Sequence, residues 1–134
     1  MIHRRRYTSR RHQRRGSVLV EVAATVPILF AFFGFLWEFS RAEMIRQAAA
    51  TACYEGAREG TVAGGTSAEV MAVSQGILDA AGIRNATIVV TPRVIDPTTQ
   101  SVQVRVTVPL NNNAITTPCF FKDKQINSDI TLIR

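Results

Sequence analysis

The stretch that decides the fold reads Arg14-Arg15-Gly16-Ser17-Val18-Leu19-Val20-Glu21, and the apolar sequence that begins there continues to Trp37. Between Val18 and Trp37 the only charged side chain is Glu21. As an α-helix this segment rises about 30 Å, which is roughly the thickness of the hydrocarbon core of a bilayer. Membrane helices tolerate a proline such as Pro27, and Trp37 is typical of the lipid–water interface. We therefore predict a membrane-spanning helix.

The net charge of +6 resides entirely in the arm that precedes this helix. Residues 1–16 hold seven of the 16 basic residues and no acidic residue, whereas residues 17–134 hold nine basic and ten acidic ones. A basic block beside an apolar helix is typical of the cytoplasmic side of a membrane, which places residues 38–134 outside. Tyr7 is the only aromatic residue in the arm, so no nucleic acid is expected as a partner.

Gly16 and Glu21 together indicate that the arm is removed. A carboxylate inside a membrane helix is costly and usually marks function. Gly16 has no side chain, so a peptidase can approach its backbone closely. A cut between Gly16 and Ser17 would discard residues 1–16 as a leader and make Glu21 the fifth residue of the new chain. We predict that Gly16 and Ser17 form the cleavage site and that Glu21 guides assembly.

Other interpretations of this segment stay open. The helix can be an uncleaved anchor in which Glu21 reaches the head groups without a partner. It can be a secretory signal cut after Ala42, which would release a soluble product beginning at Glu43, although Glu38 interrupts that site. A twin-arginine signal around residues 9–11 fits less well, because polar residues follow it.

Residues 38–61 read as a helical stem that continues the membrane helix. Small and apolar residues recur on one face at helical spacing: Ile45, Ala49, Ala52, Cys53, Gly56 and Gly60. Residues 63–65 break the helix. Thr66 and Glu69 then have the spacing of a capping box, which predicts a second helix to about Ala81 with Gly82 as its C-cap. Its buried face is predicted to hold Val70, Val73, Ile77 and Ala80 or Ala81.

The rest of the chain is strand-like. Alternating valines predict a half-buried strand over residues 101–108. A second strand is predicted over 87–95, with Pro92 marking an edge or a bulge. The third covers 126–133, with one face formed by Ile126, Ser128, Ile130 and Leu132. The predicted fold is α+β: a long N-terminal membrane-spanning helix that continues into a stem, packed on a small antiparallel sheet with one further helix.

Three segments follow from this organisation. Residues 1–16 form the basic cytoplasmic leader, residues 17–62 the transmembrane helix and stem, and residues 63–134 a small extracytoplasmic α+β domain. In an exported domain the only two cysteines, Cys53 and Cys119, are expected to form a disulfide, with two buried free thiols as the alternative. Both histidines lie in the leader, and no phosphate-binding loop or carboxylate cluster occurs. We therefore expect no enzyme, no metal and no other cofactor.

These features together resemble the TadE-like family of pseudopilins from tight-adherence (Flp-type) pilus systems. The resemblance covers about residues 14–62. It rests on the sequences Arg15-Gly16-Ser17-Val18-Leu19-Val20-Glu21, Val22-Ala23-Ala24-Thr25-Val26-Pro27, Trp37-Glu38-Phe39-Ser40-Arg41, Arg46-Gln47-Ala48-Ala49 and Glu55-Gly56-Ala57-Arg58-Glu59-Gly60.

The resemblance implies a minor pseudopilin of the bacterial inner membrane that acts in pilus assembly and adherence, with the pilus as a further location. An aspartyl prepilin peptidase would remove its leader, and its partners would be other pilin-like subunits and the pilus assembly machinery. Glu21 would pair with the new amine of Ser17 on a neighbouring subunit. The alternative from another class is a single-pass membrane-tethered protein that keeps its Arg-rich tail to bind cytoplasmic anions.

Overall fold

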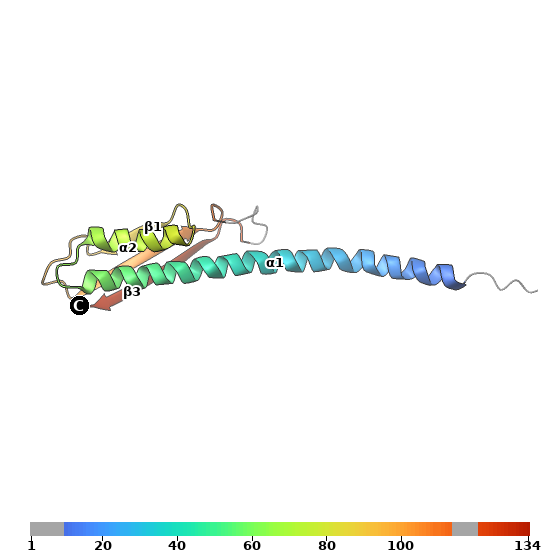
Figure 1. The fold of residues 1–134 in the computed structure, drawn as a ribbon, viewed down its shortest axis with the longest axis horizontal. Helices are drawn as coiled ribbons and strands as arrows, with labels where there is room; N and C mark the ends of the chain where they lie inside the picture. The colour runs from blue at the N-terminus through green and yellow to red at the C-terminus, as the bar shows by residue number, and fades with distance from the viewer. Residues whose placement is uncertain (1–9, 114–120) are drawn as a thin grey trace, which may run out of the picture. The chain divides into compact units, whose positions relative to one another are not determined.

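The computed structural model describes residues 10–113 and 121–134, with side chains from Gly16 onward (Figure 1). Its elements in chain order are α1 Arg10–Thr61, α2 Ser67–Ala80, β1 Thr87–Thr91, β2 Ser101–Pro109 and β3 Gln125–Ile133. A long apolar N-terminal helix, a second helix and a three-stranded antiparallel sheet confirm the predicted α+β fold. Two compact units meet inside α1, between Leu36 and Trp37, and each is described by itself.

Helix α1 begins at Arg10, inside the arginine-rich arm. The helix therefore starts six residues before Gly16, the last residue of the predicted leader. Arginine is among the better helix formers, and no proline or glycine intervenes between Arg10 and Arg15. Extending an existing helix by one residue needs no new nucleation, so the membrane helix continues into the arm.

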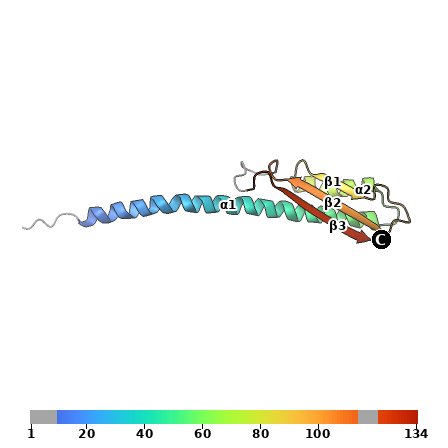
Figure 2. The same ribbon diagram turned by 180° about the vertical axis from the view of Figure 1, so that it is seen from behind.

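The sheet has the order β1-β2-β3, with both pairs antiparallel (Figure 2). Val104 of β2 is opposite Val90 of β1 and opposite Ile130 of β3. The inward face of β2 is fully buried and consists of Val102, Val104, Val106 and Val108. On the other face Arg105 is exposed and lies opposite Asp129. This alternation is the period of two that the valines predicted.

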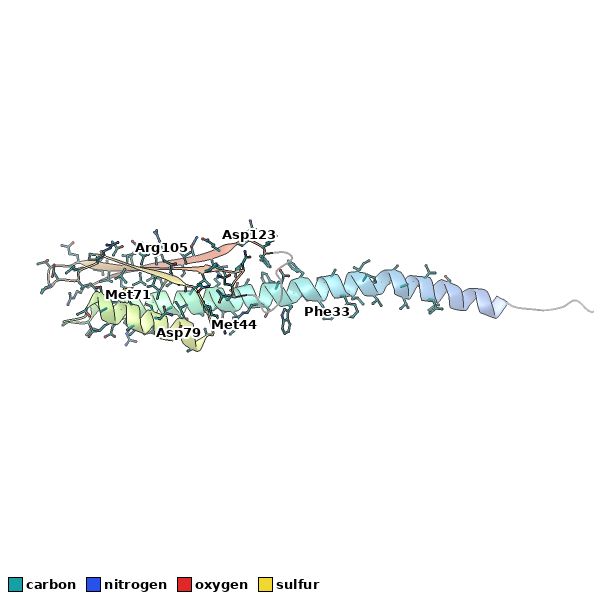
Figure 3. The ribbon with its side chains drawn as sticks, turned by 90° about the horizontal axis from the view of Figure 1, so that it is seen from above. Phe33, Met44, Met71, Asp79, Arg105 and Asp123 are labelled. Carbon is teal, nitrogen blue, oxygen red and sulfur yellow. The ribbon has the colours of Figure 1, made fainter. Side chains whose placement is uncertain are left out.

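Both helices of the unit Trp37–Arg134 lie on one side of the sheet, as Figure 3 shows in side view. The predicted stripe of the stem forms the contact, with Ile45, Ala49, Ala52 and Cys53 fully buried. An added Cβ at Gly60 would lie 2.9 Å from the Val102 side chain, so the stripe must stay small for the helix to approach the sheet.

Helix α2 carries the predicted capping box. The Thr66 hydroxyl accepts from the Glu69 backbone amide, and the Glu69 carboxylate accepts from the Thr66 amide at 2.9 Å. At the other end Gly82 takes a φ of +66° and its amide donates to the Asp79 carbonyl, while Ile83 donates to Leu78. This is a Schellman ending, in which Ala81 is the C-cap and Gly82 follows it.

Two local predictions need correction. The buried face of α2 is formed by Val70, Ser74 and Leu78, so it is rotated from the predicted one and includes a serine. Strand β1 ends at Thr91 instead of continuing to residue 95, because Pro92 has no amide to donate to a sheet ladder. In β3 the predicted face is present, since Ile126, Ser128, Ile130 and Leu132 are the half-buried positions.

Candidate functional site

The membrane segment presents an apolar helical surface. Every side chain from Gly16 to Trp37 is exposed, including Phe30 at 73% and Val20 at 71%. By length and composition this helix can cross a membrane, and it lies near the N-terminus. A soluble core helix with the same composition would be buried in its own domain. So much exposed apolar surface needs a non-aqueous environment or a partner.

Gly16 occupies open space inside α1. A Cβ added there would meet nothing within 4 Å, so packing in this structure does not require glycine. In a helix interior glycine is about 1 kcal/mol less favourable than alanine. Packing in the described structure therefore does not explain this glycine. The predicted scissile bond to Ser17 lies within the helix.

Glu21 is exposed one helical turn after Ser17. Side chains four residues apart share a helix face, and the Cα–Cβ bond of Glu21 tilts toward the N-terminus, in the direction of Ser17. No hydrogen bond or ion pair of the Glu21 carboxylate occurs among the described side chains. The Glu21 carbonyl oxygen accepts a bond from the Thr25 hydroxyl at 2.8 Å. Glu21 and Ser17 thus lie on the same face of α1.

Cys53 is a buried free thiol that donates to the Ser128 carbonyl oxygen at 3.2 Å. Burial raises the pKa of this thiol above its ordinary value. The contact ties the stem helix to β3. Cys119, the predicted partner in a disulfide, lies outside the described residues, so the bridge remains a prediction.

Asn113 joins three segments at one end of the unit, and no pattern in the sequence predicted this role. Its side-chain oxygen accepts from the Arg84 amide at 2.6 Å, and its side-chain nitrogen donates to the carbonyls of Arg84 and Pro109. Its own carbonyl accepts from the Arg41 guanidinium at 3.1 Å. Asn113 is 5% exposed, so these bonds are shielded from water. Nearby, the Phe121 amide donates to the Glu38 carboxylate at 3.3 Å.

Two hollows lie between α2 and β1 and share Met71 and Ile88 in their lining. The only ionisable side chain among their lining residues is Arg93. Among the described residues no group of three potential metal ligands occurs.

The comparison with protein families gives one finding. The profile of the family described as TadE-like protein matches residues 16–58. No curated protein and no solved structure matches the chain significantly. A TadE-like segment that contains a candidate membrane helix fits a membrane protein associated with tight-adherence pili. The resemblance predicted from the sequence is confirmed, and residues 16–58 are a TadE-like segment.

Proposed function

We propose that this protein is a minor pseudopilin-like subunit for assembly of a tight-adherence pilus, processed by a prepilin peptidase after Gly16. The observation that carries this proposal is a coincidence of boundaries. The TadE-like match begins at Gly16, which is the residue before the predicted cut and also a glycine for which the fold has no packing use. The apolar run of the membrane segment begins two residues later, at Val18.

The membrane is the first partner in this proposal. The N-terminus lies in the cytoplasm because the seven arginines precede the apolar segment, and the unit Trp37–Arg134 lies outside the bacterial inner membrane. The peptidase would act at the cytoplasmic surface, where Gly16 enters the bilayer. The product would be a helix that starts with the amine of Ser17.

Glu21 supplies the assembly step. After cleavage its carboxylate lies one turn from the end of its own helix, and it can pair with the Ser17 amine of a neighbouring pilin-like subunit. An unpaired charge in the hydrocarbon region is costly, so pairing favours one depth and one kind of partner. The exposed carboxylate and its place on the same helix face as Ser17 support this role.

A disulfide between Cys53 and Cys119 belongs to the same proposal, because the outer side of the membrane is oxidising. The bond from Cys53 to Ser128 would then describe the reduced chain. Thiol labelling of the exported protein under denaturing, non-reducing conditions tests the bridge. Protection of both cysteines supports it, and two labelled thiols per chain contradict it.

The mature N-terminus is the decisive measurement. Intact-mass analysis of the protein from a host that has the prepilin peptidase should give a chain that begins at Ser17. The alternative function, in which the arginine tail binds cytoplasmic anions, requires a chain that retains residues 1–16. A chain that still begins at Met1 in such a host would exclude the pseudopilin mechanism.

A further inference from the structure

Three parts of the unit Trp37–Arg134 lie at one of its ends: the first turn of α1 in this unit, the connection from α2 to β1, and the connection from β2 to β3. Arg41 of α1 bonds to Asn113, and Asn113 bonds to Arg84 in the connection from α2 to β1. The connection from β2 to β3 reaches the same end, since the Phe121 amide donates to Glu38. Asn113 and Phe121 are thus hydrogen-bonded to the first turn of α1 in this unit, and Arg84 is joined to that turn through Asn113.

Glu38 and Arg41 lie just after the end of the apolar segment. Arg41 follows Trp37 by four residues, which is about 6 Å along a helix. The head-group region on one side of a bilayer is roughly 5–7 Å thick, judged from the total and hydrocarbon thicknesses. If the apolar helix spans the membrane as proposed and ends at Trp37, Asn113 and Phe121 lie near the head groups, because each is hydrogen-bonded to the side chain of Arg41 or Glu38.

The basic side chains at this end have no carboxylate partner among the described residues. Arg84, Lys122 and Lys124 are exposed. The two ion pairs among the described residues are Arg46–Glu43 and Arg58–Glu55, so none of the three cations takes part in one. The acidic side chains Asp123 and Glu38 keep their charge and accept hydrogen bonds from uncharged groups. Asp123 accepts from the Asn111 side chain at 2.7 Å, and Glu38 accepts from Phe121. The cations remain available to an external anion.

Lys124 also lies close to the Asn113 junction. Its carbonyl accepts from the Leu110 amide at 3.0 Å, and the Leu110 carbonyl accepts from the Asn113 amide at the same distance. Figure 3 shows Asp123, which stands between the two lysines in the chain, at the same end of the unit as Met44 of α1. We call the surface formed by Arg84, Lys122 and Lys124 the basic end surface.

We propose that the basic end surface rests on the outer face of the membrane and binds the phosphates of anionic phospholipids. This inference depends on the proposed spanning helix. It adds a second membrane contact, made by residues more than forty positions beyond that helix. A basic residue near an anionic bilayer contributes about 1 kcal/mol, or about a fivefold preference for anionic over zwitterionic lipid. The spanning helix and the basic end surface would together hold the unit against the membrane before it enters any assembly.

Tryptophan fluorescence locates the surface, because Trp37 is the only tryptophan in the chain. The full chain is reconstituted in vesicles that contain a lipid with a nitroxide on its head group. Trp37 should be quenched, which tests the spanning helix alone. In a Trp37→Phe background, Lys122→Trp should also be quenched. Val94→Trp is the control, since Val94 is 68% exposed and follows β1 at the opposite end of that strand.

A charge series tests the lipid preference. Spin-labelled phosphatidylglycerol should associate with the reconstituted full chain several-fold better than spin-labelled phosphatidylcholine, and salt should weaken the preference. Lys122→Gln with Lys124→Gln should reduce it by about fivefold or more. Arg93→Gln, an exposed cation outside the basic end surface, should leave it unchanged.

The outcomes separate this inference from the proposed function. Quenching of Trp37 with no more quenching at residue 122 than at residue 94 overturns the inference and leaves the spanning helix intact. An unchanged lipid preference in the double lysine variant also overturns it. Absence of quenching at Trp37 overturns the spanning helix, and the inference fails with it.

Discussion

The Ser74 hydroxyl donates to the Ala52 carbonyl oxygen at 3.0 Å, so a buried side chain of α2 is bonded directly to the backbone of α1. This contact exists because residue 56 has no side chain. A Cβ built on Gly56 would overlap the Ser74 oxygen, and the next nearest atom, the Val70 carbonyl oxygen, lies 3.3 Å away. The close packing of the two helices therefore depends on the Ser74 hydroxyl and on the absence of a side chain at Gly56.

Gly56→Ala should destabilise the unit by about 2 kcal/mol through overpacking. Ser74→Ala should cost about 1 kcal/mol for the lost hydrogen bond. The double variant should be less destabilised than the sum, because the added methyl group then has room. Denaturant unfolding of the full chain in detergent measures all three. Gly76→Ala is the matched control, since a Cβ there meets nothing, and it should be neutral or stabilising. If the losses in the free energy of unfolding of Gly56→Ala and Ser74→Ala add up in the double variant, Gly56 and Ser74 are not in the close contact described above.

Asn113→Ala should cost about 2 kcal/mol, because it leaves the buried Arg84 amide without an acceptor and removes the bonds to the Arg84 and Pro109 carbonyls. The neighbouring Asn112 is exposed, and Asn112→Ala should change the free energy of unfolding by less than about 0.5 kcal/mol. Equal effects of the two variants would show that the junction at Asn113 contributes nothing specific.

The reduced chain should lose stability in alkaline solution because of Cys53. Burial raises its folded pKa above the ordinary thiol value of about 8.5, so the folded state holds the proton more tightly than the unfolded state. The contribution is complete below about pH 8.5 and is lost as the pH rises toward the folded pKa. Comparing unfolding curves of the wild type and Cys53→Ala across this range isolates the effect. Parallel pH profiles would contradict it.

Gly16→Leu should block processing without disturbing the fold, since space is open around Gly16. The full-length chain should accumulate in the membrane, detected by intact mass. Gly34→Leu makes the same change at another open position of α1 and should be cleaved normally. Normal cleavage of Gly16→Leu would show that residue 16 is not part of the recognition site.

Glu21→Gln should insert and be cleaved but fail to support pilus assembly, because an amide cannot form an ion pair with the Ser17 amine. Cross-linking to other pilin-like subunits should fall with it. Glu43→Gln is the control: it removes the same charge from α1 at a surface ion pair with Arg46, which contributes little. Normal pilus assembly with Glu21→Gln would falsify the assembly role of Glu21. The carboxylate would then only reach the lipid head groups, without a partner.

Sequence reasoning succeeded where a local pattern determines the structure. The capping box of Thr66 and Glu69 and the alternating valines of β2 depend on neighbours within a few residues, so their spacing was sufficient. The candidate site was inferred from an equally local signal, an acidic residue in an apolar segment and a glycine just before it, and its role stays a prediction.

Buried polar residues could not be predicted in the same way. Ser74 bonds to a residue 22 positions away, and Asn113 bonds to Arg84 across 29 positions. Nothing in the local sequence distinguishes Asn113 from the asparagines beside it, since its role exists only after two distant connections meet. The helical start at Arg10 was not predicted, because the arginine-rich segment was interpreted only as a basic leader; its intrinsic helix propensity favours the helix found there.

The position of Arg10 has a kinetic consequence for processing. Because α1 begins six residues before Gly16, the predicted scissile bond is held in a closed turn. Proteolysis of such a bond requires local opening, and its rate follows the population of the open form when opening is fast. Gly16 increases that population, as a poor helix former near the end of the helix. Leader removal is therefore expected to report how often the first turns of α1 unwind, so alanines placed between Arg10 and Arg15 should slow maturation while leaving every contact with the peptidase at Gly16 unchanged.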